Sequence, residues 1–380
     1  FKFTAKKGLE TSLIESKSKY KVAHWIQEIT RSLLSFKLSG KTSLAMDRND
    51  ALTKNYLDAR ESHFKILLVQ FIQMIGFKIL VTAGLLIIGG LLVLNQEMNI
   101  GQFVAAEIII LLVINSVEKL IGGLETFYDI LTSLEKIGQV VDKELEDQEG
   151  TDPFKSLKPI QAELEEIAYT TPDGKEVLKN INLTIAQKDR ILLQGASGSG
   201  KTTLLKLLSG IVSPTSGALY INDTSIKGIS PNIYRSHVGQ VLPEQHPFEG
   251  TILENITFGN PSISAERVNE VIKRLGLISF VKKQTEGLNT MLYAQGQHIP
   301  YTVSKRIILA RAIVHEPRLL FLKDPLEHFE ASEARDIVSY LTDDSHPWAI
   351  VVASGNPIWK NKCAHILTLP QGILKKNENA

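Results

Sequence analysis

Two long apolar runs dominate the first third of the chain. Residues 66–94 hold a single charge, Lys78, and residues 100–117 also hold one, Glu107. At about 1.5 Å per residue, a helix formed by the first run is long enough to cross a bilayer of roughly 30 Å. A polar break at residues 95–99 separates the two runs. The pattern predicts two membrane helices joined by a tight hairpin, with buried helices of a soluble protein as the alternative.

The polar sequence on both sides of this hairpin predicts its orientation. Lysines and arginines accumulate before residue 66, and further lysines follow residue 117. The positive-inside rule therefore places both ends of the hairpin in the cytoplasm and its loop outside. Glu107 is expected to face a bundle interior or an aqueous cavity, where it either lines a substrate path or hydrogen-bonds between helices.

Amphipathic spacing and a change of composition predict the domain boundary. Residues 1–63 and 122–145 have the apolar spacing of amphipathic helices, and the second segment is expected to continue the second span into the cytoplasm. Residues 146–160 are charged and rich in turn-forming residues. We therefore predict a partial transmembrane domain at 1–145, the linker at 146–160 and a second domain at 161–376.

The second domain alternates strand-like and helix-like segments. The strand-like segments are residues 164–169, 178–185, 191–194, 218–221, 319–322 and 349–353. The helix-like segments are residues 203–209, 266–275, 304–315 and 332–341. Such alternation predicts an α/β core with a partly parallel sheet. The expected fold class is thus an α-helical membrane domain followed by an α/β domain.

One stretch of the second domain carries a phosphate-binding motif, G-x-x-x-x-G-K-[ST], without mismatch. Its residues are Gly195, Ala196, Ser197, Gly198, Ser199, Gly200, Lys201, Thr202 and Thr203. The glycines let backbone N–H groups turn toward phosphate oxygens, and the following helix N-terminus adds positive potential. Lys201 supplies a mobile charge for the outer phosphates, and the Thr202 hydroxyl is the candidate Mg²⁺ ligand. The motif predicts that the chain binds a nucleoside triphosphate.

The composition of the chain argues against several classes of partner and site. Lysine and arginine number 42 against 41 aspartates and glutamates, so no basic surplus points to nucleic acid as a partner. The single Cys363 excludes an intramolecular disulfide framework and a cysteine metal site. The chain begins at Phe1 without an initiator methionine or a signal-peptide pattern, and we expect it to be a fragment or a processed product.

In the order of its parts, the chain resembles an ATP-binding cassette (ABC) exporter. The parts that carry the likeness are the membrane hairpin, the linker, Tyr169 ahead of the P-loop, and the P-loop itself. The likeness is to half-transporters of the toxin and peptide secretion type. It implies the type-1 exporter fold with only the last two membrane helices present, and adenine stacking on Tyr169.

The same resemblance implies cofactors, partners and location. ATP and Mg²⁺ would be the cofactors, and the partner would be a second ABC half-transporter in a homodimer or heterodimer. The protein would lie in a plasma or inner membrane with its nucleotide-binding domain in the cytoplasm. The sequence does not indicate the transported substrate, because membrane helices expected to contact it are absent.

The chain departs from the family pattern at several functional positions. These are Pro243 for the glutamine, residues 299–303 for the signature LSGGQ, Lys323 for the Mg²⁺-binding aspartate, Asp324 for the catalytic glutamate, and Ser354 for the switch histidine. Lys323 places a positive charge where a cation should bind, which weakens the expected Mg²⁺ site. Asp324 is the remaining candidate general base, but its side chain is one methylene shorter than glutamate. The cassette is therefore expected to be degenerate.

Two functions follow from this pattern. The first is an ATP-binding subunit of an ABC-type membrane exporter that couples nucleotide binding to transport, with weak or absent hydrolysis of its own. The alternative is a non-hydrolysing, ATP-sensing membrane scaffold of a secretion assembly. A soluble P-loop enzyme such as a kinase is disfavoured by the membrane hairpin.

Overall fold

The computed structural model describes residues 2–155 and 159–376. The chain divides into two compact units, Phe1–Leu145 and Glu146–Ala380.

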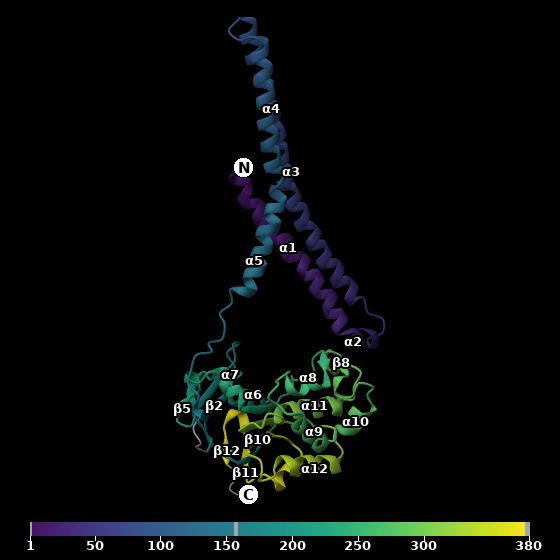
Figure 1. The fold of residues 1–380 in the computed structure, drawn as a ribbon, viewed down its shortest axis with the longest axis vertical. Coiled ribbons are helices and arrows are strands. Elements are labelled where there is room, and N and C mark those ends of the chain that lie inside the picture. The colour runs from purple at the N-terminus through teal and green to yellow at the C-terminus, as the bar shows by residue number, and fades with distance from the viewer. Residues whose placement is uncertain (1, 156–158, 377–380) are drawn as a thin grey trace. The chain divides into compact units, whose positions relative to one another are not determined.

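The first unit is helical (Figure 1). Its helices are α1 (Lys2–Arg31), α2 (Leu33–Leu38), α3 (Leu44–Leu94), α4 (Ile100–Gly122) and α5 (Leu124–Val141). Helix α3 packs against α1 at one end and against α4 at the other, and α5 contacts α1. Within the described residues, α3 and the stretch Ile100–Lys119 of α4 are long and apolar enough to cross a membrane. The predicted pair of apolar helices is confirmed, although α3 begins well before the apolar run.

The hairpin between α3 and α4 is fixed by a reciprocal cap. The Asn99 side-chain oxygen accepts from the Gln102 backbone N–H at 2.7 Å, and the Gln102 side-chain oxygen accepts from the Asn99 N–H at 3.1 Å. These two bonds satisfy donors that the first turn of α4 leaves without intrahelical partners. The polar break in the sequence thus ends one helix and starts the next.

Polar side chains join the helices of the first unit where apolar packing is sparse. The joined pairs are Thr11 with His63 (2.9 Å), Ser12 with Thr132 (3.0 Å), Gln70 with Tyr128 (3.1 Å) and Lys78 with Glu118 (3.0 Å). By contrast, many large apolar side chains of α3 and α4 are exposed, among them Phe77 and Ile88. A helix that is apolar around its circumference is typical of a membrane span.

The second unit is built on a largely parallel six-stranded sheet in the order β12-β11-β3-β10-β9-β6. Its strands are β3 (Arg190–Gln194), β6 (Val238–Val241), β9 (Leu319–Lys323), β10 (Ala349–Ala353), β11 (His365–Thr368) and β12 (Lys375–Lys376). Strand β12 is antiparallel at the edge, and the other pairings are parallel. The expected α/β fold with a partly parallel sheet is confirmed.

Two smaller sheets accompany it. An antiparallel sheet in the order β2-β1-β4-β5 contains β1 (Gln161–Thr170), β2 (Glu176–Ala186), β4 (Ser216–Ile221) and β5 (Thr224–Ser225). A short pair joins β7 (Gly250–Thr251) to β8 (Met291–Leu292). The helices are α6 (Lys201–Leu208), α7 (Pro231–Ser236), α8 (Ile252–Thr257), α9 (Ala265–Arg274), α10 (Ile278–Lys283), α11 (Tyr301–Ile313) and α12 (Ala331–Leu341).

The central strands are apolar on both faces because each face lines a separate core. Leu192 packs into one core with residues of α8, α9, α11 and α12. Ile191 and Leu193, its neighbours in β3, pack into the other core with residues of α6 and the antiparallel sheet. Successive side chains of a strand point to opposite faces, so the continuous apolar run is what this position requires.

The segment predicted to be a linker is attached to the second unit. Arg235 of α7 contacts the Glu146 carboxylate through two nitrogens, at 2.5 and 2.6 Å. The Thr151 N–H donates to the Gly228 carbonyl oxygen at 2.8 Å. A short 3₁₀ turn, Pro153–Lys155, then precedes β1.

Candidate nucleotide site

The loop between β3 and α6 has a shape that glycine alone adopts without strain. Backbone φ is +149° at Gly195, +77° at Gly198 and +98° at Gly200. A Cβ atom at Gly195 would lie 2.8 Å from the Ser199 Oγ atom, and one at Gly200 would lie 3.0 Å from the Val177 carbonyl oxygen. The loop therefore requires glycine for its packing as well as for its conformation.

The motif residues surround the N-terminus of α6. Residues 195–198, which include Ala196 and Ser197, are exposed, whereas Ser199 and Gly200 are buried beneath them. Thr202 and Thr203 follow Lys201 in the first turn of α6, and both are half-buried. Exposed backbone amides at a helix N-terminus form an arrangement suited to anions.

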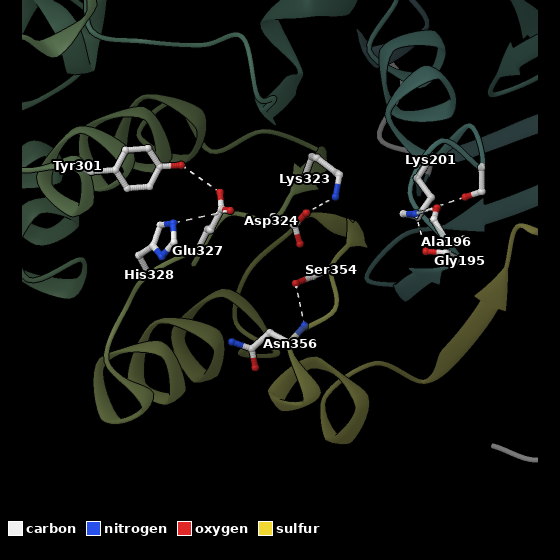
Figure 2. Close-up of polar contacts among 11 residues, drawn as sticks. Gly195, Ala196, Lys201, Tyr301, Lys323, Asp324, Glu327, His328, Ser354 and Asn356 are labelled. Atoms are coloured by element: carbon white, nitrogen blue, oxygen red, sulfur yellow. Dashed lines mark hydrogen bonds and ion pairs between the residues drawn. The ribbon is translucent and has the colours of Figure 1, made fainter. Parts of the chain in front are cut away.

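Lys201 spans this loop. Its Nζ atom donates to the carbonyl oxygens of Gly195 and Ala196, each at 2.7 Å, and lies 3.3 Å from the Ser199 Oγ atom (Figure 2). Burial lowers the pKa of Lys201, the nearby Lys323 ammonium lowers it further, and Asp324 opposes both effects. The Lys201 charge thus lies at the loop and is electrostatically coupled to the end of β9.

Tyr169, the expected adenine partner, lies one strand away from the loop. It is half-buried near the end of β1 and pairs with Leu178 of β2. The Leu178 side chain in turn approaches Gly200, where an added Cβ atom would be 3.0 Å from its Cδ2 atom. Because neighbouring strands are about 4.8 Å apart, the backbone of Tyr169 lies one strand spacing from the residue that packs on Gly200. Tyr169 and the motif are far apart in the sequence, and the pairing of β1 with β2 brings them closer in space.

The strand register brings the altered positions to the same edge of the sheet as the loop. Ala353 of β10 pairs with Leu193 of β3 on one side and with Lys323 of β9 on the other. The carboxyl ends of these parallel strands therefore meet, and this edge is the usual ligand-binding edge of an open α/β sheet. Ser354 follows β10, is buried, and accepts a hydrogen bond at its Oγ atom from the Asn356 N–H at 3.2 Å.

At this edge Lys323 and Asp324 form an ion pair. The Lys323 Nζ atom donates to the Asp324 Oδ2 atom, and both residues are half-buried (Figure 2). The backbone of Asp324 has φ +40° and its N–H donates to the Ala353 carbonyl oxygen at 2.9 Å. The candidate base is thus present beside β10, but an ammonium group is already bound to its carboxylate.

The start of α11 differs from a phosphate-binding helix terminus. Its N-cap is Pro300, which has no N–H to donate. The Tyr301 hydroxyl donates to the Glu327 carboxylate at 3.0 Å, and the His328 ring meets the Tyr301 ring edge-on at a centroid distance of 5.5 Å (Figure 2). The Tyr301 phenol, bonded to the Glu327 carboxylate, therefore lies in the stretch that the resemblance assigns to the family signature.

The end of β6 carries the position expected for the family glutamine. Pro243 occupies it, and Gln245 follows nearby. The Gln245 side-chain oxygen accepts from the Leu242 N–H at 2.9 Å. This side chain therefore caps its own turn.

One contact of this edge was not predicted from the sequence. Tyr301 falls in the stretch at the signature position, but Glu327 is 26 residues away and no motif links the two residues. Only the packing of the start of α11 against the loop after β9 brings them together.

Comparisons with known proteins agree with this geometry. Residues 178–327 match the family model described as ABC transporter. The alpha-hemolysin translocation ATP-binding protein HlyB of Escherichia coli O157:H7 is 33% identical over 272 residues, 69% of this chain and 38% of that protein. A putative export ATP-binding/permease protein of Rickettsia bellii (strain RML369-C) is 26% identical over 339 residues, 89% of this chain and 58% of that protein. The chain thus spans roughly two fifths to three fifths of the length of these relatives.

A solved structure shows the same fold. A bacterial Atm1-family ABC exporter with ATP bound superposes with a TM-score of 0.84, covering 98% of this chain and 67% of that chain at 18% identity. Together with the matched domain and the similarity to toxin-export proteins, this superposition identifies the chain as a member of the ABC transporter family with the fold of an ABC exporter.

Proposed function

We propose that the chain is the ATP-binding subunit of an ABC-type membrane exporter that couples nucleotide binding to transport, with weak or absent hydrolysis of its own. The conformation of the phosphate loop carries this proposal, because three positive-φ glycines and the Lys201 ammonium form an anion cradle at a helix N-terminus. Two relatives are named as translocation or export ATP-binding proteins, which supports the same reading.

The residues that would hold ATP divide into two groups. The phosphate group consists of Gly195, Ala196, Ser197, Gly198, Ser199, Gly200, Lys201, Thr202 and Thr203. Tyr169 would stack on the adenine ring, since its aromatic face suits a base. The hydrolysed bond would lie toward the outer phosphates, beside Lys201.

The Lys323–Asp324 ion pair supports weak hydrolysis. The carboxylate oxygen of Asp324 is occupied by the Lys323 ammonium and is therefore less available to contact an attacking water. Ser354 carries no imidazole, and its hydroxyl already accepts a bond from Asn356. The candidate catalytic residue Asp324 would therefore activate water poorly.

The start of α11 determines which residues would complete a nucleotide site when this chain pairs with a second half-transporter. By analogy with the family, a second half-transporter would complete each nucleotide site with its own signature. In a homodimer, both sites would meet Pro300 and Tyr301 in place of that signature. In a heterodimer, only the nucleotide site on the partner would meet Pro300 and Tyr301 in place of the signature. The cassette would lie in the cytoplasm, beneath a plasma or inner membrane crossed by α3 and α4.

The same ion pair favours a second candidate, a non-hydrolysing, ATP-sensing membrane scaffold of a secretion assembly. In that role nucleotide occupancy alone would change the assembly. The two candidates share the nucleotide site and differ in whether transport follows from its occupancy.

Phosphate release by the complete native membrane complex tests the proposal. The complex is compared with the same complex carrying Lys201→Ala, and with Lys206→Ala as the matched control, since Lys206 is on α6 but bound to Glu244. We expect slow release that does not depend on Lys201, together with ATP binding that does. Fast release that collapses only in Lys201→Ala would show that this site hydrolyses ATP and would overturn the weak-hydrolysis proposal.

A transport assay with the same three complexes separates the two candidates. Substrate movement that is lost in Lys201→Ala supports the exporter subunit. Assembly that responds to ATP through Lys201 without substrate movement supports the scaffold.

A further inference from the structure

The end of β9 places a second ammonium group at the phosphate loop. The Lys323 side chain is 18% exposed and points from β9 to the side of Asp324 that faces the loop (Figure 2). Strand pairing fixes this position, because Lys323, Ala353 and Leu193 are aligned across three neighbouring strands. Lys201 begins the helix that follows β3, so the two lysines approach the same space from two strands.

The charges of the two lysines act on each other. The Lys323 ammonium is one cause of the lowered pKa of Lys201, after burial, whereas Asp324 acts in the opposite direction. Asp324 is a single carboxylate shared by this pair of cations. A polyanion between the lysines would remove their repulsion, and an ionised triphosphate has the required charge.

Apart from the Thr202 hydroxyl, the candidate Mg²⁺ ligand in the first turn of α6, the residues at this edge do not fit Mg²⁺. Magnesium takes oxygen ligands, usually one or two carboxylates in addition to phosphates and water. Asp324, the carboxylate at the end of β9, is bound by Lys323. A divalent cation here would also be repelled by the Lys323 charge.

We propose that this site binds its nucleoside triphosphate without Mg²⁺, and that the ammonium groups of Lys201 and Lys323 neutralise the phosphates in place of the metal ion. The inference rests on the proposed nucleotide function of the loop. The Lys323 ammonium has three N–H donors, so on binding it would contact the phosphate oxygens while it stays paired with the Asp324 carboxylate.

The test is the affinity of the purified full chain for ATP, measured by calorimetry at constant ionic strength in excess EDTA and again in excess Mg²⁺. We expect affinity in EDTA to be equal to or higher than in Mg²⁺, because the free triphosphate carries more negative charge for two lysines to bind. Affinity that falls by about tenfold or more in EDTA would overturn the inference.

Charge reversal at position 323 sharpens the test. In Lys323→Asp, a carboxylate replaces the ammonium, so we expect affinity in EDTA to fall by about tenfold or more and Mg²⁺ to restore part of it. The neutral variant Lys323→Gln should lose affinity in EDTA without gaining this rescue. Lys283→Asp, the same change at an exposed position on α10, is the control and should bind as the parent does. Rescue by Mg²⁺ that is equal in the parent and in Lys323→Asp would contradict the role of Lys323.

The outcomes also separate this inference from the function on which it rests. A folded parent chain that binds no ATP in either buffer would reject the nucleotide function itself. ATP binding that requires Mg²⁺ would reject only the metal-free mode. Thermal unfolding of each variant shows whether it is folded, and if Lys323→Asp does not fold, the parent and Lys323→Gln measurements still decide the question.

Discussion

The phosphate loop and the edge formed by Lys323, Asp324 and Ser354 are neighbours on one sheet but differ in what constrains them. The loop depends on backbone shape, since Gly195 and Gly200 have positive φ and no room for a Cβ atom. The edge depends on side chains that extend from the ends of regular strands. Its residues are those at which the sequence is expected to depart from the family pattern, and the strands that carry them pair in continuous register.

This difference means that the residues at the edge can change without a change of the fold. The positions of β9 and β10 are fixed by apolar residues that face two cores, among them Phe321 in one core and Val352 in the other. Lys323 and Ser354 come at or just after the strand ends, where the cores impose no apolar requirement. Chemistry at this edge is therefore free to change without loss of the scaffold, whereas a change in the loop would alter its backbone.

The largest expected effect tests the backbone constraint on the loop. Gly200→Ala adds a left-handed penalty of about 1–2 kcal/mol and, because its Cβ atom would lie 3.0 Å from the Val177 oxygen, roughly 1–3 kcal/mol of overpacking. Gly174→Ala is the matched control, since Gly174 has φ +85° but open space around it. Denaturant unfolding should show the larger loss for Gly200→Ala. Equal losses would mean that the contact with β2 does not constrain the loop.

A second prediction concerns the stability contribution of Arg311 on helix α11. Near its C-terminal end, Arg311 is half-buried beside the stacked rings of Phe248 and Phe258 and donates to the backbone and side-chain oxygens of Asn255 at 2.7 and 2.9 Å. Loss of such charged hydrogen bonds in Arg311→Met should lower the free energy of unfolding by roughly 1.5–3 kcal/mol. Arg335→Met, at an exposed position on α12, is the control and should change stability little. A comparable loss of unfolding free energy in Arg335→Met would contradict the view that the Arg311 hydrogen bonds stabilise the fold.

The sequence predicted the parts of the fold that apolar patterns specify. The runs at 319–322 and 349–353 are found as β9 and β10, and the phosphate motif lies between β3 and α6 as expected. Strand β6 was missed because Gly239 and Gln240 interrupt its short apolar pattern, and its parallel pairing with β9 is what makes it a strand. The edge strand β11 also depends on pairing, in its case with β3.

Other differences have physical causes that a local pattern does not contain. Helix α3 begins at Leu44 because charged residues are also good helix formers, supported by pairs such as Glu61 and Lys65 at 2.8 Å. The apolar run beginning at residue 66 marks where the surface of α3 becomes apolar, whereas the helix itself starts at Leu44. At the site, the bond between Tyr301 and Glu327 depends on packing across 26 residues. The assignment of the site residues to ATP stays a prediction.

A third prediction uses pH to compare the loop with the edge. The lowered pKa of Lys201, caused by burial and then by Lys323, means that its charge is lost at lower pH than for an ordinary lysine. Because phosphate binding requires the charged form, ATP affinity should fall by about tenfold as the pH rises, and the fall should begin below the ordinary lysine value of about 10.4. In Lys323→Gln this fall should begin at higher pH, since one cause of the lowered pKa is removed. Calorimetry across the pH range measures both midpoints, and coincident midpoints would show that the two lysines are not coupled.

The smallest expected effect lies at the start of α11. Tyr301→Phe removes the hydrogen bond to Glu327 and should lower the free energy of unfolding by about 0.5–1.5 kcal/mol, toward the lower end because the ring is half exposed. Burial, followed by the bond to Glu327, raises the pKa of Tyr301 to about 12.

The raised pKa gives this last effect a definite pH dependence. A group whose folded-state pKa exceeds its unfolded value stabilises the fold below the unfolded value, which for tyrosine is about 10. The stability difference between the parent and Tyr301→Phe should therefore be complete near pH 8 and decrease above about pH 10. Glu327→Gln, which keeps an acceptor but removes the charge, should lower the Tyr301 pKa while burial still holds it above its ordinary value. Ultraviolet titration of the phenolate measures that shift. An unchanged titration in Glu327→Gln would mean that the two groups are independent, and that the altered edge of the site is a set of separate substitutions without a network of its own.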